Sequence, residues 1–518
     1  MNRVHKKTAL SQTAQSILAA NEEGESFLWG RYEEQLPLCA FTANGLNCRK
    51  CFQGPCRINP FGDPPTRGVC GADREQIVME NLFQMTLNGV LETARSISCI
   101  QESFEARELP ELDSDLPQKT GERLRKQGIL PVRKKQLFEV QNGFFSHKGY
   151  LSQTLKDLTR LGLIHYGLLK GLAASPSPAK NEFTQDPEGA NLFLVGQPPW
   201  NHLLTLGQKA REQAGGKKVN LWLQGTRGLP FFPPFPDHGS PEIGLARGVD
   251  ALILYPNSDF PALEDLARKW KIPILLVGEG KSFDRIAAEA FALALDHQKN
   301  KGHVTPLPLS QSQAPEGVVF DRMEGISRLL KAGQVKGILV IWAEPNVKQS
   351  FFEKTLCLME SASDQKILIW VGGEAAAQAA LLNEELARRM GKKGAKTPEG
   401  NLGNPGYLFS WGEIPSLVSF LRGLSPGLEF HQMPLGVAFP ELSRASTWAT
   451  AVGFLALGFA VQVGTQLPFW GSPSLSEVLQ RDWPNISGGA FMASPSLPDG
   501  QRQAREMISY IQSRSFEK

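Results

Sequence analysis

The most constraining feature of this 518-residue sequence is a group of cysteines near its amino terminus. Five of the seven cysteines lie between residues 39 and 70, and four of these are spaced as Cys48-x2-Cys51-x4-Cys56-x13-Cys70. Four thiolates can each bind one iron of a 4Fe–4S cluster, and a Cys-x2-Cys pair places two sulfur atoms in one small loop. The spacing therefore predicts one 4Fe–4S cluster per chain, bound by these four cysteines.

Neighbouring residues suit such a loop. Gly54 and Pro55 precede Cys56, and two further glycines flank Cys70, so the backbone has the freedom to turn tightly around a cluster. Five cations in or beside the motif would stabilise an anionic cluster, or form a solvated surface patch; these are Arg49, Lys50, Arg57, Arg67 and Arg74. Zinc is the main alternative metal, but structural zinc sites usually contain two closely spaced ligand pairs, and only one pair is present. A third alternative is a set of unligated core cysteines.

The overall charge excludes some partners. With 55 basic and 52 acidic residues, the formal net charge is +3, so no global feature indicates nucleic acid or a membrane surface. The first 20 residues contain no apolar run of the kind found in a secretory signal. The long apolar stretch at 448–464 contains three glycines and a glutamine, which favours a buried helix leading into a buried strand over a membrane span. We therefore expect a cytoplasmic protein.

The pattern of apolar residues predicts an α/β fold with three parts. Helical periodicity over 73–97 and 148–174 indicates a helical, cluster-binding domain at 1–185. Short apolar runs without polar alternation, typical of parallel strands buried on both faces, then predict two Rossmann-like domains at 186–315 and 316–518. No G-x-G-x-x-G loop follows the first strand of either domain, so neither is expected to bind a dinucleotide. The predicted strands are 191–196, 219–225, 250–256, 272–278, 336–343, 366–373, 406–412, 459–464 and 489–494.

Four segments resemble the nickel-containing anaerobic carbon monoxide dehydrogenases. The cysteine segment at 48–73 is similar to the part of that family that binds its electron-relay cluster. Segments 248–261 and 335–346 resemble strands that lead to the family's active-site loops, and 457–492 resembles its final α/β unit. The resemblance implies a helical domain followed by two Rossmann-like domains, in a dimer.

The family's nickel–iron–sulfur active site is bound by a histidine and several cysteines at strand ends, and this sequence lacks them. There is no cysteine between Cys99 and Cys357 and none after Cys357. The expected ligand positions fall instead on Val195-Gly196-Gln197, Gln224-Gly225, Ser258, Glu344, Gly373 and Glu413. The resemblance therefore predicts that nickel is not bound.

Other family residues are also replaced. Thr93 stands where the resemblance implies a catalytic histidine, and Ala445 stands where it implies a catalytic lysine. Cys39 matches one of the two cysteines that each subunit gives to a cluster shared across the dimer axis, but Asn47 occupies the second position. Cys39 is thus either a leftover thiol or an incomplete ligand, and Cys357 lies in a helical pattern away from every ligand position.

Three functions follow from this pattern. The first is a cluster-binding electron-transfer or assembly subunit that cannot oxidise carbon monoxide, with a ferredoxin-like redox partner. The second is an enzyme with different chemistry in the former cavity, which Glu344, Glu374, Glu413 and Arg227 would line. The third is a structural pseudoenzyme that pairs with an active paralogous subunit. Whether the chain is an enzyme thus remains open at this stage, and a homodimer is expected in the first case.

Overall fold

The computed structural model describes most of the chain. The described residues are 7–22, 27–100, 108–146, 151–173, 188–196, 198–212, 218–223, 242, 245, 248–256, 261–278, 282–300, 328–330, 332–373, 375, 378–391, 408–409, 414–493 and 499–514. No helix among them is both long and apolar enough to cross a membrane.

The amino-terminal part is helical and carries one small hairpin. Its helices are α1 (Ser11–Glu22), α2 (Leu28–Glu34), α3 (Ala40–Ala43), α4 (Arg74–Ile100), α5 (Gln118–Lys126), α6 (Gln136–Ser146) and α7 (Leu151–Ala173). The hairpin consists of β1 (Asn47–Cys48) and β2 (Cys56–Arg57), which pair antiparallel. The two long helices predicted from periodicity are confirmed as α4 and α7.

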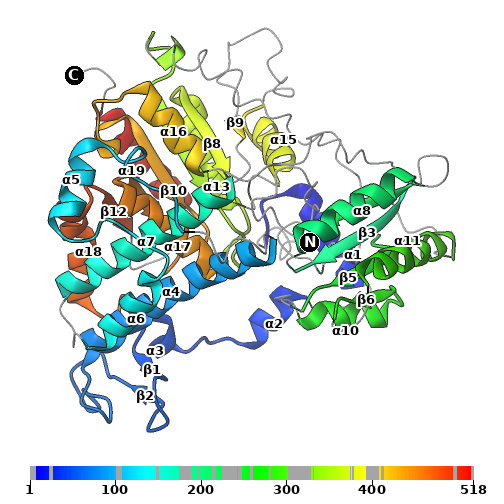
Figure 1. Ribbon diagram of the computed structural model, residues 1–518, viewed down its shortest axis with the longest axis horizontal. Helices are drawn as coiled ribbons and strands as arrows, with labels where there is room; N and C mark the ends of the chain where they lie inside the picture. Colours follow the sequence, from blue (N-terminus) through cyan, green and yellow to red (C-terminus); the bar gives the residue numbers. More distant parts are fainter. Residues whose placement is uncertain are drawn as a thin grey trace.

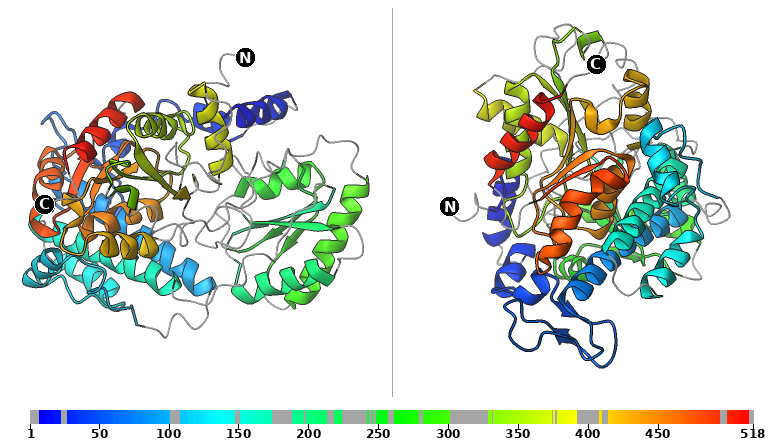
Figure 2. Two further views of the ribbon diagram at one scale, coloured as in Figure 1. Left: turned by 90° about the horizontal axis from the view of Figure 1, so that it is seen from above. Right: turned by 90° about the vertical axis from the view of Figure 1, so that its left-hand side faces the viewer.

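A four-stranded parallel sheet follows, in the order β4-β3-β5-β6. Its elements are β3 (Ala190–Val195), α8 (Trp200–Glu212), β4 (Val219–Leu223), β5 (Ala251–Leu254), α10 (Pro261–Lys269), β6 (Ile274–Leu276) and α11 (Phe283–Asn300). Every residue of β4 and β5 is buried, as expected for strands covered on both faces. This unit lies apart from the larger sheet in Figure 1, and in Figure 2 helices cover both of its faces.

The second sheet has six parallel strands in the order β12-β11-β10-β7-β8-β9. Its elements are β7 (Gly337–Trp342), α13 (Glu353–Asp364), β8 (Ile367–Gly372), α15 (Ala379–Arg389), β9 (Leu408–Phe409), α16 (Ile414–Leu424), η3 (Phe430–Gln432), β10 (Leu435–Phe439), α17 (Ala445–Leu457), β11 (Ala460–Val463), α18 (Pro473–Ile486), β12 (Ala490–Ala493) and α19 (Gly500–Gln512). The apolar stretch at 448–464 is confirmed as a helix running into a strand, α17 and β11. Strand β10 is absent from the prediction, although it lies at the centre of the sheet.

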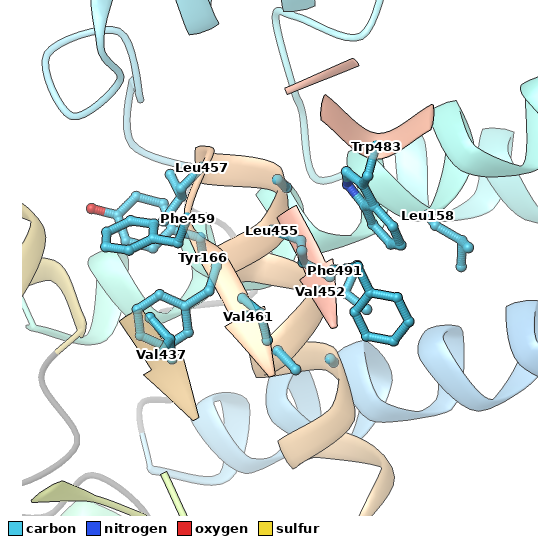
Figure 3. Packing of buried hydrophobic residues seen from close by; sticks show 14 of the residues in the cluster. Leu158, Tyr166, Val437, Val452, Leu455, Leu457, Phe459, Val461, Trp483 and Phe491 are labelled. Atoms are coloured by element: carbon cyan, nitrogen blue, oxygen red, sulfur yellow. The ribbon is translucent and has the colours of Figure 1, made fainter. Parts of the chain in front are cut away.

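The helical part and the six-stranded sheet share one hydrophobic core. Helix α17 is buried on all sides, and its residues contact α4 and α7 on one side and the sheet on the other. Figure 3 shows Val452 and Leu455 of α17 packed with Leu158 of α7, Val461 of β11 and Phe491 of β12. Helices α4 and α7 are therefore anchored on the second sheet through α17.

Candidate metal centre

The predicted cluster ligands lie on the β1–β2 hairpin and on the loop that follows it, at the edge of the molecule in Figure 1. Cys48 lies directly opposite Cys56 in the antiparallel pair. The base of the hairpin is fixed by the bond from Ile58 N–H to the Leu46 carbonyl (2.9 Å), and both side chains are buried. Asn81 of α4 donates its side-chain amide to the carbonyls of Gly45 and Asn47 at 2.8 and 2.9 Å. The hairpin is therefore attached firmly to the longest helix.

Glycines shape the loops that carry the other two thiols. The Gly54 N–H bonds to the Cys51 carbonyl (3.2 Å), and a Cβ at Gly54 would lie only 3.1 Å from the Cys56 nitrogen. Gly71, next to Cys70, has a φ of +88°, which L-residues with side chains rarely adopt. The Gly68 N–H bonds to the Ala72 carbonyl (2.8 Å) and closes this second loop. Each loop therefore depends on its glycine for its path past a cysteine.

The four thiols differ in exposure. Cys51 and Cys70 are exposed, whereas Cys48 and Cys56 are half-buried. Burial, and then the negative charges of Glu80, Cys56 and Cys70, raises the pKa of the Cys48 thiol, while the Lys50 backbone N–H opposes this shift. The Val69 N–H lies 3.5 Å from the Cys56 sulfur, within the distance of a hydrogen bond to sulfur. These thiols thus influence one another electrostatically across the hairpin.

The donor set suits a soft metal group. Thiolates are the ligands that iron–sulfur clusters require, and the first and third cysteines approach from facing strands while the other two lie on the flanking loops. Among the described residues, no three His, Cys, Asp or Glu side chains are gathered closely enough to hold a single metal ion. The assignment of a 4Fe–4S cluster therefore rests on the order of the four cysteines and on the turns that carry them.

The cations of the motif are partly engaged within the chain. Lys50 pairs with Glu80 of α4 at 2.6 Å, and Arg67 donates to the Gly71 carbonyl at 2.8 Å. Arg57 lies over the Phe41 ring, 5.5 Å from its centroid. Arg67 thus closes the loop around Cys70, whereas Arg57 and Lys50 join the hairpin to α3 and α4.

Cys39 and Asn47 lie beside each other near this site. Cys39 is exposed at the start of α3, where hydrogen bonding to Thr42 is the main cause that lowers the pKa of its thiol. Asn47 donates its side-chain amide to the same Thr42 hydroxyl at 3.3 Å, and its Oδ1 has no partner among the described residues. The two positions where the resemblance implies ligands of a shared cluster therefore both lie next to Thr42, but only one of them carries a thiol.

The strand ends that the structure describes present no thiol ligands. Gly196 after β3 is buried, Glu344 follows β7, and Gly373 follows β8. Five of the expected ligand positions lie outside the described residues: Gln197, Gln224, Gly225, Ser258 and Glu413. The other proposed cavity residues, Arg227 and Glu374, also lie outside them. The positions that are described provide one carboxylate and no thiolate, so they do not fit a nickel–iron–sulfur group.

Glu344 lies at the switch point of the six-stranded sheet. The chain passes from β7 outward to β8 and β9, and then from β10 outward in the other direction, so a crevice is expected between the carboxyl ends of β7 and β10. In this protein the loop after β7 and the loop after β10 bond to each other across this crevice. The Glu344 N–H donates to the Glu441 carbonyl (3.1 Å), the Ser443 hydroxyl donates to Glu344 Oε2 (3.1 Å), and Asn346 donates to the Leu442 carbonyl. The buried Glu344 carboxylate thus accepts a hydrogen bond from the loop after β10.

The neighbouring strand end is covered by Trp342. A Cβ at Gly372 would lie 2.3 Å from the indole ring of Trp342, and one at Gly373 would lie 2.8 Å from the indole nitrogen. The ring also packs edge-on against Phe454 of α17. The position where the resemblance implies a metal-binding cysteine is therefore filled by an aromatic side chain from the adjacent strand.

The positions of the expected proton-transfer groups also face their own chain. Gly89 of α4 packs so closely on α17 that a Cβ there would lie 2.0 Å from the Ala445 carbonyl oxygen. Thr93 donates to the Gly89 carbonyl (3.1 Å), and Glu92 accepts the Ser446 N–H at the start of α17 (3.3 Å). Neither Thr93 nor Ala445 can transfer a proton in the way that histidine or lysine does.

Cys357 is buried in α13, where burial is the main cause that raises its pKa to about 12.

Sequence reasoning missed Trp342, Ser443 and Glu92, which fill and bond the strand-end region. Trp342 belongs to a run of apolar residues, and only its place at the end of a parallel strand signals its role. Ser443 and Glu92 gave no local signal, because their partners Glu344 and Ser446 lie far away in the sequence.

Comparison with known proteins supports the resemblance. Residues 46–124 match the Prismane/CO dehydrogenase family. Carbon monoxide dehydrogenase of Rhodospirillum rubrum is 56% identical over 61 residues, which are 12% of this chain and 10% of that protein. The strongest sequence matches of this kind span only 10 to 15% of the length of those relatives. The high identity is thus concentrated in a short segment.

Over the whole chain the similarity is lower. The beta subunit of carbon monoxide dehydrogenase/acetyl-CoA synthase from Moorella thermoacetica is 21% identical over 94% of this chain and 90% of that protein. The structure of carbon monoxide dehydrogenase IV from Carboxydothermus hydrogenoformans superposes with a TM-score of 0.77 at 18% identity, over 96% of this chain and 97% of that chain. The predicted resemblance and the α/β fold with parallel sheets are therefore confirmed.

Proposed function

We propose that this relative of the carbon monoxide dehydrogenases is a 4Fe–4S protein that transfers electrons or supports assembly, and that it does not oxidise carbon monoxide. One contrast carries the proposal. The hairpin and the loop after it retain four thiols, whereas Trp342 and Glu344 occupy the strand ends that would need thiol ligands. A cluster bound at the hairpin would supply one-electron transfer.

The hairpin is suited to electron exchange because it lies at the surface. Cys51 and Cys70 are exposed, so a cluster bound there would be close to a docked redox protein. A ferredoxin-like protein is the proposed electron partner, a homodimer is the proposed assembly, and a paralogous subunit is the alternative. The division at residues 185 and 315 likewise remains a proposal, since the helical part shares its core with the second sheet.

Metal analysis of protein purified without oxygen tests the cofactor. We expect about four irons per chain, with nickel and zinc near background, because one cube has four thiolate ligands. Cys56→Ser should lose the iron and its visible absorption, and should destabilise residues 40–75, since metal binding contributes folding free energy to such a loop. Cys357→Ala is the matched control and should keep the iron, because this thiol is buried in α13. Stoichiometric zinc or nickel in place of iron would refute the assignment.

Activity measurements test the second half of the proposal. Protein incubated with nickel under reducing conditions should not reduce a viologen dye with carbon monoxide, because the described strand ends hold no thiolate to bind a catalytic metal. The same protein should accept electrons from a small-molecule mediator and return them to it, and this exchange should depend on Cys56. Turnover of carbon monoxide in proportion to bound nickel would show that the active site survives.

A further inference from the structure

A short turn at residues 67–73 lies against the Cys56 sulfur. The Val69 N–H donates to this sulfur at 3.5 Å, and a Cβ at Gly68 would also lie 3.5 Å from it. The turn carries Cys70, which is itself a predicted cluster ligand. One turn therefore holds one predicted ligand and contacts another, which belongs to the preceding hairpin.

Backbone hydrogen bonds fix the path of this turn. Arg67 and Asp73 form an antiparallel bridge, and the Gly68 N–H donates to the Ala72 carbonyl at 2.8 Å. The Gly71 N–H donates back to the Gly68 carbonyl at 2.8 Å, and Gly71 has a φ of +88°. This pattern is that of a three-residue hairpin loop, in which a type I turn is followed by a glycine with positive φ.

Val69 occupies the first central position of the type I turn, and Cys70 occupies the second. Neither residue has a positive φ, as this turn type requires. The Val69 side chain is 67% exposed, whereas its N–H points to the Cys56 sulfur. Val69 therefore contributes its backbone donor to the site, and its side chain packs little.

The turn is attached to the start of α4. Asp73 Oδ1 accepts the Gln76 N–H at 3.0 Å, and Gln76 Oε1 accepts the Asp73 N–H at 3.1 Å, which is a reciprocal cap. Arg67 also donates from its guanidinium to the Gly71 carbonyl at 2.8 Å. The Val69 donor is thus held in place by bonds that do not involve a metal.

We propose that Val69 is a positioning residue whose N–H, through its hydrogen bond to the Cys56 sulfur, raises the reduction potential of the cluster at this site. The inference rests on the proposed 4Fe–4S function. Hydrogen bonds to the sulfur atoms are among the factors that set the potential of an iron–sulfur cluster. Reduction adds negative charge to these sulfur atoms, and a fixed N–H donor stabilises that charge. The bond therefore favours the reduced state.

Val69→Pro removes this donor and is compatible with the turn. Proline has no backbone N–H, and it is favoured at the first central position of a type I turn. The measurement is a redox titration, monitored by EPR, of the full-length protein purified without oxygen. At a fixed applied potential, the ratio of reduced to oxidised cluster should be about tenfold lower in the variant than in the wild type. For a one-electron couple this is a decrease of about 59 mV in the midpoint potential.

Val69→Ala is the matched control, because it keeps the N–H and shortens only the exposed side chain. Its midpoint potential should equal that of the wild type. A second measurement detects the contact directly in the unmodified sequence. Wild-type protein labelled with 15N-valine should show a 15N hyperfine coupling to the reduced cluster, and labelled Val69→Ala should lose this coupling because its amide nitrogen at position 69 is unlabelled.

Three results would overturn the role of Val69. The first is an equal potential in wild type and Val69→Pro when both hold about four irons per chain. The second is the absence of the 15N coupling in labelled wild-type protein, which needs no variant to fold. The third is an equal decrease in Val69→Pro and Val69→Ala, which would assign the effect to the side chain. Wild-type protein without iron would instead refute the proposed function, so the two failures are distinguishable.

Discussion

His165 shows how one buried side chain can set an acid limit on the fold. It lies on α7 facing α17, where its Nε2 is 3.0 Å from the Thr450 hydroxyl and its Nδ1 has no partner among the described residues. Burial lowers the pKa of this imidazole to about 3. The folded protein therefore holds it neutral, whereas the unfolded chain protonates it near pH 6.5.

Glycines have an equally local effect beside the cysteines. Gly54 in the hairpin and Gly71 in the loop after it let the backbone turn past the thiols.

Replacing His165 by glutamine should make the fold less sensitive to acid. Because the folded pKa lies below the unfolded one, the wild type loses stability as the pH falls from about 6.5 to about 3, by up to roughly 4 kcal/mol. His165→Gln keeps a group that can bond to Thr450 but does not titrate. Urea unfolding at pH 7 and pH 4 should show a smaller loss in the variant. An equal loss in both proteins would mean that His165 titrates normally.

At the level of secondary structure, close helix contacts hold the helices next to the cysteine hairpin on the sheet. Gly89 of α4 and Gly162 of α7 both face α17, and a Cβ would lie 2.0 Å from the Ala445 carbonyl oxygen in one case and 2.6 Å from that of Val452 in the other. These are contacts with backbone, which cannot move aside as the end of a flexible side chain can. Helix α17 thus packs directly against the backbones of both helices.

Gly89→Ala should therefore destabilise the protein. The added methyl group would force α4 and α17 apart, at a cost of roughly 1–3 kcal/mol. Gly423→Ala is the matched control, since Gly423 is exposed in helix α16 and a Cβ there would meet nothing within 4 Å. That change should be neutral, or stabilising by up to about 1 kcal/mol, because alanine favours the helix. Equal midpoints of chemical unfolding for both variants would contradict the close contact.

At the level of the whole molecule, residues 36–70, which include the hairpin, carry five of the strongly exposed large hydrophobic side chains. Among the described residues, nine large hydrophobic side chains are strongly exposed, and five of them are Leu36, Leu38, Phe52, Phe61 and Val69. Together with Cys39, they occupy the part of the chain that the family resemblance places near a dimer axis. An apolar surface of this kind is typical of an interface between chains.

Asn47→Cys tests the dimer and its missing cluster together. In the proposed homodimer, the unmodified protein has two Cys39 thiols near the axis, so iron should remain near four per chain. The variant supplies the second thiol beside Cys39, and iron should rise toward about six per chain, with a new EPR signal. Asn44→Cys, a half-buried position on the same segment, is the control and should leave the iron content near four. A monomer in solution, or six irons per chain before substitution, would refute this assembly.

Several features of the protein could be predicted from the sequence because they are local. The four cysteines lie on one short segment, so their place on a hairpin and the loop after it follows from their spacing, whereas their role as cluster ligands stays a prediction. The helices α4 and α7 and the strands β3, β5, β7, β8 and β11 follow from periodicity and from runs of buried apolar residues. The missing thiols at strand ends could also be predicted, because each position follows its own strand.

Only the tertiary structure decided how distant segments meet. Strand β10, with the run LGVAF, was missed as a strand, yet it pairs with β7 and β11 at the centre of the sheet. Trp342 covers Gly373, and the Glu344 N–H bonds to the Glu441 carbonyl, only because parallel strands bring loops far apart in sequence to one edge. Such contacts depend on strand order, which is set by packing of the whole sheet, whereas ligand spacing and periodicity are written within single segments.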